Sequence, residues 1–554
     1  MRTTEILVAL ALAAPATAAK AEQPLLAPPV RVDADDKIIA EPPERDFSEI
    51  WDVTRNTWLR HLDLSYIGLA ASDRPAMNVN AWDEVPDSSW FMNRIGRRAV
   101  SIEELLEGAP GAAPGPGKWE VNRLKTQGYT PGVRFRDSAG EGFVLKLDLP
   151  EAPERNSAAD KIGSLLVHAA GYYAPQNTIV VFRPEDLVLA KDARFEDLLG
   201  RRRPMTQNDL DAVISKLSRR EDGTIRALAS HYLPGAPKGP FPYWGRRKDD
   251  PNDLIPHELR RELRGFRVIA SWFNHVDVKE VNTLDVFVQK DGGGHLRHYL
   301  IDFGSTMGSG DFMDGPKRVG HEYLYDGSAT LKSLVSFGAW ERPWERECKV
   351  LYPEVGHFEA ERFDPARWKP NYPNLAFEEM DASDAYWGAK IVTAFTDEMI
   401  RALAAAGKYS RPDVTAYVEK TFRERRARIG RHWFSVVSPL ESFELSLEEG
   451  KWRLRFRDLA VERGYARSQE RRYRFELRKP TRLEMVQNGR SEASGEIAFE
   501  PASYPSPGAD RFGRTASLVV DIFASLESLP VRVVLGNDSA GTGPKVLGWR
   551  HAPN

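Results

Sequence analysis

The spacing of apolar residues changes along the chain, and each change predicts a different kind of element. Between residues 119 and 147, apolar and polar positions alternate between turn residues, which predicts three strands, over 119–124, 133–136 and 142–147. Helical spacing then predicts a helix over 157–170, which Gly171 ends. Further strands are expected over 178–182 and 185–190. This part of the chain therefore predicts a strand-rich unit with one helix.

The middle of the chain predicts helices around one β-hairpin. Apolar spacing predicts helices over 256–274, 383–405 and 413–433. Two alternating segments, 283–289 and 295–301, are joined by Asp291-Gly292-Gly293-Gly294, which is a hairpin signal. Because a hairpin places its two ends side by side, the residues that precede and follow it are expected to lie close together.

From Ser442 onward the period returns to that of strands. Apolar residues alternate in short runs between turns, so roughly four to seven strands and a small β-sandwich are expected. Arginines occupy the other face of two strands. A solvated surface is the default interpretation, and docking to a glycan or to the cell envelope is the alternative, for Arg453, Arg455, Arg457, Arg472 and Arg474.

Composition and charge narrow the class of protein. The 554 residues are 42% hydrophobic and 28% charged, and the net charge of −3 argues against a general nucleic-acid binder. Arg2 precedes an apolar run over 6–14, and Pro15 and small residues follow it, which predicts a signal peptide over 1–21. The run is far shorter than the roughly 20 residues of a membrane-spanning helix, and no other stretch is apolar enough to span. The single cysteine, Cys348, leaves no intrachain disulfide to expect.

Two polar clusters flank the predicted hairpin. The sequence reads HVDVKEVN over 275–282 and DFG over 302–304. Hard oxygen ligands suit Mg²⁺, so Asn282 and Asp302 are predicted to hold a magnesium ion that bridges nucleotide phosphates. Asp277 is expected to orient an acceptor hydroxyl and to take its proton.

Cations and glycines outside the hairpin complete the predicted nucleotide site. Lys279 is expected to face the γ-phosphate, and Lys146 is costly in an apolar strand unless it is paired. Lys146 also resembles, by its position, the lysine that holds the α- and β-phosphates in kinases, and this resemblance implies the same role. Asp160 lies in the first turn of the next helix and is the expected partner of Lys146; a helix-capping role is the alternative. Gly128 and Gly132, in the turn between the first two strands, are expected to bring backbone N–H groups to the phosphates.

Two further segments leave their role open. Trp51, Trp58, Trp82 and Trp90 are expected to be buried against the next domain, and a substrate-contacting surface is the alternative. The long segment 233–250 contains three consecutive cations. A structural crossover is slightly favoured there over an anion-binding site.

These motifs resemble those of the atypical protein-kinase-like superfamily, in particular the HipA-like and CotH-like kinases, over about residues 119–433. The resemblance implies an α+β, bilobal protein-kinase-like fold with an N-terminal extension and a C-terminal β-sandwich-like domain. Val276 stands where regulated kinases have arginine, so activation by a phosphorylated loop at that position is not expected, and Asp160 replaces the usual helix glutamate. The expected domains are a signal peptide, a linker with an aromatic-rich extension, an N-lobe, a C-lobe and a β domain, over 1–21, 22–115, 116–190, 191–435 and 436–554.

The resemblance implies an exported ATP- and Mg²⁺-dependent phosphotransferase that acts on a hydroxyl group of a protein or a small molecule. Its expected partners are a nucleotide and an unidentified acceptor, without nucleic acid, and its expected location is periplasmic or secreted. Two alternatives stay open, namely a catalytically silent pseudokinase or binding module of the cell envelope, and an AMP-transferring enzyme on the same fold. The motifs do not choose among these functions.

Overall fold

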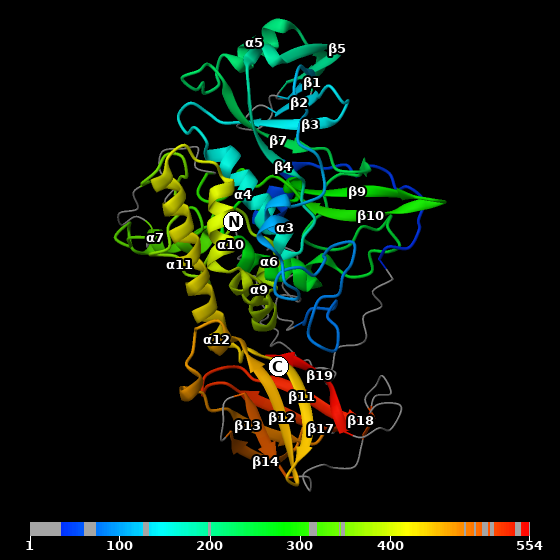
Figure 1. Ribbon diagram of the computed structural model, residues 1–554, viewed down its shortest axis with the longest axis vertical. Helices are drawn as coiled ribbons and strands as arrows, with labels where there is room; N and C mark the ends of the chain where they lie inside the picture. Colours follow the sequence, from blue (N-terminus) through cyan, green and yellow to red (C-terminus); the bar gives the residue numbers. More distant parts are fainter. Residues whose placement is uncertain are drawn as a thin grey trace, which may run out of the picture.

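A computed structural model describes most of the chain (Figure 1). The expected signal peptide and Gly128 lie outside the described residues, which are 35–59, 74–125, 132–197, 201–309, 318–342, 344, 350–480, 483–491, 495–500, 508–509, 515–537 and 544–552. Within these ranges, no helix is both long enough and apolar enough to cross a membrane.

A seven-stranded sheet forms one end of the molecule, at the top of Figure 1. Its strand order is β4-β7-β3-β2-β1-β5-β6, and β1 and β5 are its one parallel pair of neighbours. Strand side chains and the helix α5 (Gln207–Ile214) enclose a separate hydrophobic core. The strands are β1 (Trp119–Lys125), β2 (Gly132–Arg136), β3 (Gly142–Leu147), β4 (Asn177–Phe182), β5 (Leu187–Glu196), β6 (Arg202–Pro204) and β7 (Ile225–His231).

The sheet extends further along the chain than the sequence predicts. The expected boundary between the lobes, at residue 190, falls inside β5, and β7 returns to pair with both β3 and β4. The boundary is therefore wrong, and the sheet runs to His231. The reason is that six consecutive residues of β7 are buried, so the strand shows no alternation between apolar and polar positions.

The helix α4 (Arg155–Ala170) connects the sheet to the rest of the molecule. It packs against β3, β4 and β7 and against the helices α3 (Ile102–Glu107) and α10 (Asp397–Ala406). Ser157 lies inside α4, and its backbone N–H donates to Asp148 at 2.9 Å. Asp160 therefore does not cap the helix, contrary to the alternative interpretation of the sequence.

A helical lobe lies below the sheet and includes the expected hairpin (Figure 1). The predicted helix over 383–405 is two helices, because Phe395 leaves helical geometry and Thr396 caps the next helix through its hydroxyl. The elements are β8 (Ala236–Pro237), α6 (Arg261–Trp272), β9 (Thr283–Lys290), β10 (Gly293–Leu300), α7 (Gly327–Val335), α8 (Leu375–Glu378), α9 (Ala382–Ala394), α10 (Asp397–Ala406) and α11 (Pro412–Val436), with 3₁₀ turns at His257–Leu259 and Glu280–Asn282.

The C-terminal domain is a β-sandwich, as the sequence predicts. A three-stranded sheet, β11-β12-β15, and a larger sheet, β14-β13-β17-β18-β19 with β16 beside β17, contribute to one shared hydrophobic core. Its elements are β11 (Leu440–Glu448), β12 (Lys451–Asp458), α12 (Leu459–Glu462), β13 (Arg474–Arg478), β14 (Met485–Arg490), β15 (Glu496–Phe499), β16 (Gly508–Ala509), β17 (Thr515–Phe523), β18 (Val531–Asn537) and β19 (Pro544–His551). The α+β class is thus confirmed.

The N-terminal extension, with α1 (Glu49–Thr57), is buried only in part. Trp90 is buried and stacks on His298, with ring centroids 3.5 Å apart. Trp51 and Trp58 are more than half exposed, at 59% and 57%, so the expectation that these two rings are buried is wrong. Trp51 lies in α1 and Trp58 directly after it, beside the exposed Ile50 and Leu59, and the Trp58 ring lies 5.7 Å from that of Tyr325.

One buried carboxylate joins three distant parts of the chain. Asp83 of the extension accepts hydrogen bonds from Arg261 at the start of α6, at 2.7 Å, and from Ser383 in α9, at 3.3 Å. It also accepts from the backbone N–H of His551 at the end of β19, at 2.9 Å. The extension, the helical lobe and the β domain therefore meet at Asp83.

The segment 233–250 is part of the framework. Arg247 is buried, contacts Asp285 at 2.9 Å and Asp249 at 3.1 Å, and donates to the carbonyl oxygen of Lys238. Its charge is satisfied inside the protein. This agrees with the structural crossover that the sequence slightly favours.

Candidate active site

The loop after α6 is held by its own hydrogen bonds. Asn282, in the 3₁₀ turn before β9, donates from its side-chain amide to the backbone oxygen of Asp277 at 2.7 Å and to its carboxylate at 2.9 Å. These two bonds orient the amide group of Asn282 and leave its carbonyl oxygen as the atom that can bind a cation. Asp277 and Asn282 thus form one unit.

The hairpin brings Asp302 beside this loop. Leu300 pairs with Thr283 at the base of the hairpin, and the N–H of Ile301 donates to the oxygen of Asn282 at 3.0 Å. Asp302 follows with φ of +62°, a left-handed conformation that costs free energy in a residue with a side chain. The expected proximity of Asn282 and Asp302 is therefore present in the structure.

Lys146 joins both halves of the site. From β3, its ammonium contacts the carboxylate of Asp160 in α4 at 2.5 Å and that of Asp302 at 3.1 Å. Asp160 is itself held by the side-chain amide of Asn177 at 2.7 Å and by the N–H of Phe303 at 3.3 Å. The lysine thus links the sheet, α4 and the end of the hairpin.

Burial and neighbouring charges shift the pKa values of Lys146, Asp160 and Asp302. Burial alone would lower the pKa of Lys146, but Asp160 and Asp302 raise it above the ordinary lysine value. The ammonium of Lys146 lowers the pKa of Asp302. Burial raises the pKa of Asp160, although Lys146 opposes this effect. Lys146 therefore stays charged at neutral pH, and Asp302 is ionised beside it.

Asp277 and Lys279 form a second ion pair, in which α1 takes part. The ammonium of Lys279 lies 3.2 Å from the carboxylate of Asp277 and 2.6 Å from that of Glu49. Burial raises the pKa of Asp277 above the ordinary value. Glu49 belongs to the N-terminal extension and was not expected here; a contact across 230 residues leaves no local pattern in the sequence.

The predicted glycines add little to this geometry. Gly128 lies outside the described residues. Gly132 opens β2, and a Cβ atom added there would meet no atom within 4 Å. The structure therefore shows no close approach at Gly132 that would require a glycine.

Sequence reasoning did not single out His275 and Phe303. The His275 ring lies 5.6 Å from that of Phe303 and stacks on Phe273, and its Nδ1 atom has no hydrogen-bond partner among the described residues. Phe303 packs against α4, where a Cβ atom on Gly163 would lie 2.5 Å from the Cβ atom of Phe303. Their positions within the two motifs were the available signal.

The donor set suits a magnesium ion held jointly by protein and phosphates. Within the described residues, no group of three or more His, Cys, Asp or Glu side chains could hold a metal ion. Mg²⁺ in phosphoryl-transfer sites is bound by one or two protein oxygens together with substrate phosphates, so it needs no such cage. The Asp302 carboxylate, with 53% of its side chain exposed, and the oriented Asn282 amide fit this pattern.

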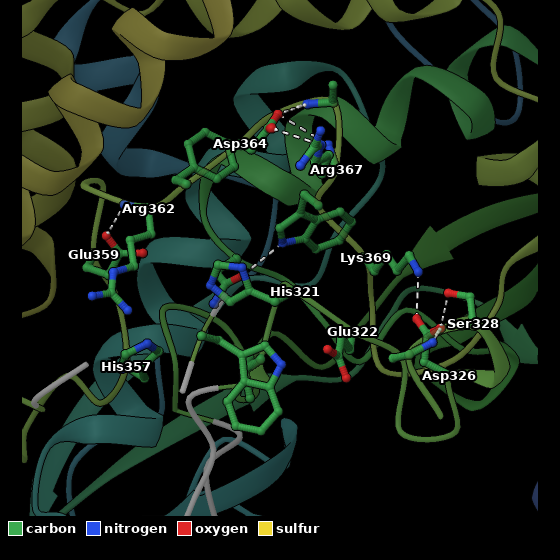
Figure 2. Close-up of a pocket in the computed structure, with 18 of the residues that line it drawn as sticks. His321, Glu322, Asp326, Ser328, His357, Glu359, Arg362, Asp364, Arg367 and Lys369 are labelled. Carbon is green, nitrogen blue, oxygen red and sulfur yellow. Dashed lines mark hydrogen bonds and ion pairs between the residues drawn. The ribbon is translucent and has the colours of Figure 1, made fainter. Parts of the chain in front are cut away.

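A cavity of about 540 Å³ lies elsewhere in the helical lobe (Figure 2). In its lining, Lys369 contacts Asp326 at 2.5 Å, and Glu359 accepts from the backbone N–H of Arg362 at 2.8 Å. Asn274 lines it, but none of the predicted site residues does. Two ion pairs, Lys369–Asp326 and Arg367–Asp364, join residues of its lining to each other. The candidate site stays at Lys146, Asp277 and Asp302, which the predicted chemistry requires.

Comparisons with known proteins give little beyond this geometry. No family model and no curated protein matches the chain. A solved structure of the Golgi casein kinase is 11% identical, with a TM-score of 0.26, and covers 73% of this chain and 95% of its own. A second structure of that kinase, with Mn/ADP bound, is 12% identical, with a TM-score of 0.27, and covers 73% of this chain and 93% of its own. At this identity and TM-score, the two structures do not indicate a function for this chain. The contacts within the chain itself define the site.

Proposed function

We propose that this protein is an ATP- and Mg²⁺-dependent phosphotransferase, and that it acts on a hydroxyl group outside the cytoplasm. The observation that carries the proposal is the position of Lys146, which contacts Asp160 and Asp302 at once. A lysine between a buried helix carboxylate and a more exposed one provides a fixed positive charge beside a metal ligand. Phosphoryl transfer requires this combination.

Each residue of the site would have a separate role in phosphoryl transfer. Lys146 would neutralise the α- and β-phosphates, and Asp302 with Asn282 would hold Mg²⁺. When bound, the ion would neutralise charge on the transferred group. Asp277 would accept the proton of the acceptor hydroxyl as its oxygen forms a bond to the γ-phosphorus and the bond to the ADP oxygen breaks. The raised pKa of Asp277 suits it to this role as a base.

Lys279 adds positive charge near Asp277. Its contact with Glu49 makes α1 a part of the same site, at the side where an acceptor would approach Asp277. We propose that Lys279 exchanges this contact for the γ-phosphate when nucleotide binds. The exchange replaces one anionic partner by another, so the cost of leaving Glu49 is largely offset.

The test combines nucleotide binding with transfer. Thermal unfolding with ATP and Mg²⁺ at about 100 times the dissociation constant should reveal a stabilisation of about 2.7 kcal/mol. Asp302→Ala should abolish it, whereas Asp291→Ala, which removes an exposed carboxylate in the hairpin turn, should not. Asp277→Ala should retain binding and lose transfer. An active Asp277→Ala variant would show that Asp277 is not the base of the transfer reaction.

Labelled nucleotides separate the remaining alternatives. Label from the γ-phosphate should reach the acceptor fraction if the protein is a kinase, and label from the α-phosphate if it transfers AMP. Absence of any nucleotide-dependent stabilisation in the folded protein would favour a binding module. Export is tested separately. Recovery of a periplasmic or secreted form that begins near residue 22 would support it.

A further inference from the structure

Arginines are five of the eleven residues that line a groove in the C-terminal domain. It has a volume of about 420 Å³ and lies along the start of β13, the end of β14 and the loop after β17. Its charged lining residues are five arginines and one acid, Glu470. The arginines are Arg467, Arg471, Arg472, Arg474 and Arg490.

Three of the five arginines have acidic partners. Arg467 contacts Glu470 at 3.2 Å, and Arg471 contacts Asp458 at 2.8 Å. Arg474 contacts Glu476, which also binds Arg478, so one carboxylate serves two guanidinium groups. Arg478 has a second carboxylate partner, Asp521 at 3.2 Å, so the three paired arginines of the groove are compensated.

The other two arginines have no carboxylate partner among the described residues. Arg472 donates to the backbone oxygens of Gln469 and Arg471. Arg490 is paired in register with Arg474, so two like charges lie directly opposite each other on neighbouring strands. Like charges in this position repel each other, and Arg474 has Glu476 as its partner, whereas Arg490 has none in the described part of the chain. Two uncompensated positive charges remain.

We propose that this groove binds the phosphate group of an anionic ligand. A phosphate carries a charge of about −1.5 to −2 near neutral pH, which matches the two uncompensated arginines. Planar guanidinium groups donate pairs of hydrogen bonds that fit phosphate oxygens. The proposal goes beyond the proposed phosphotransferase activity and does not depend on it.

The phosphate could belong to a soluble molecule or to a lipid headgroup. Leu526 lines the groove with 82% of its surface exposed. An exposed leucine beside a basic groove would enter the interface of a membrane surface but would add nothing to the binding of free phosphate. Substitution of Leu526 thus separates the two sources.

The experiment measures phosphate binding by the full chain. Radiolabelled inorganic phosphate is used in equilibrium dialysis with EDTA and low salt, in an Asp302→Ala background that removes the metal ligand of the other site. Arg472→Gln with Arg490→Gln should weaken binding roughly tenfold or more. Arg455→Gln with Arg457→Gln, which removes the same charge from β12 of the same domain, should leave it unchanged.

A second arm tests membranes. The same proteins are sedimented with vesicles of phosphatidylcholine alone or with one fifth phosphatidylglycerol. Binding that needs the anionic lipid, weakens with salt, and is lost in the Arg472/Arg490 variant and in Leu526→Ser identifies a headgroup ligand. Phosphate binding that is indifferent to Leu526→Ser identifies a soluble one.

Three results would overturn the proposal. These are absence of binding in both arms, equal affinity in the wild type and the Arg472/Arg490 variant, and an equal loss in the Arg455/Arg457 control. Because Arg472 and Arg490 are exposed, both variants should fold, and circular dichroism verifies this.

Discussion

His275 is a titratable ring among aromatic side chains. It lies 3% exposed between the rings of Phe273 and Phe303. Burial lowers its pKa to about 4, although Asp302 acts in the opposite direction. The histidine is therefore neutral in the folded protein at neutral pH. Its role at the site is to support Phe303 and the loop.

This state predicts a pH dependence of stability. Below about pH 6.5 the unfolded chain binds a proton at His275 that the folded chain excludes, so His275 lowers the free energy of unfolding as the pH falls towards 4. At pH 5 this loss amounts to about 2 kcal/mol. The cost of His275→Gln, measured by urea unfolding, should therefore shrink by about that amount between pH 7.5 and pH 5. A cost that is independent of pH would contradict the assignment.

At the scale of elements, the site depends on the close approach of α4 to the end of the hairpin. Gly163 faces Phe303, and an added Cβ atom would lie 2.5 Å from the Cβ and 3.1 Å from the Cγ of that residue. Neither atom is at the far end of a flexible side chain. A methyl group there must displace Phe303, and Asp302 is its neighbour in the chain.

Gly163→Ala should therefore weaken nucleotide binding and destabilise the protein by about 1–3 kcal/mol. The expected destabilisation is opposite in sign to the usual effect, in which alanine in place of glycine inside a helix raises the free energy of unfolding by roughly 1 kcal/mol. Gly327→Ala, at the start of α7, is the matched control, because an added Cβ atom meets no atom within 4 Å there. Thermal unfolding with and without ATP and Mg²⁺ measures both effects. A Gly163→Ala variant that binds nucleotide normally would show that the packing is not critical.

Local patterns predicted the elements that carry the site. The hairpin, the helix α4 and the proximity of Asn282 to Asp302 follow from turn residues and apolar spacing within short stretches. The Lys146–Asp160 pair was also predicted, because a lysine in an apolar strand needs a nearby partner.

Contacts between distant segments could not be predicted in the same way. The return of β7 to the first sheet and the contact of Glu49 with Lys279 leave no periodic signal in either partner. The break between α9 and α10 was missed because apolar spacing continues across Phe395. The Arg474–Arg490 pair depends on strand register, which sequence patterning leaves open here.

At the scale of the whole molecule, Asp83 holds the three parts together. Burial would raise its pKa, but Arg261 and His551 hold it below the ordinary aspartate range. Arg261 also contacts Asp384 at 3.1 Å, and both groups are buried. These groups, which we call the Asp83 joint, thus form a buried network of paired charges.

Asp83→Ala should lower the free energy of unfolding by about 3–5 kcal/mol, because it leaves the buried Arg261 with one carboxylate fewer. Asp192→Ala, in an exposed position of β5, should change it by less than about 0.5 kcal/mol. Urea unfolding measures both, and limited proteolysis should release the β domain in the Asp83 variant first. Equal stabilities of the two variants would show that the joint is not critical.

The joint also determines when the protein can finish folding. The hydrogen bond from His551 to Asp83 spans 468 positions of the chain. Synthesis from the N-terminus releases residue 551 long after residue 83, so the bond between Asp83 and β19 cannot form until that strand arrives, although Arg261 and Ser383 become available earlier. The first sheet has its own core and can form earlier. Assembly of the three parts is therefore expected to be the late, slow event in the maturation of this protein.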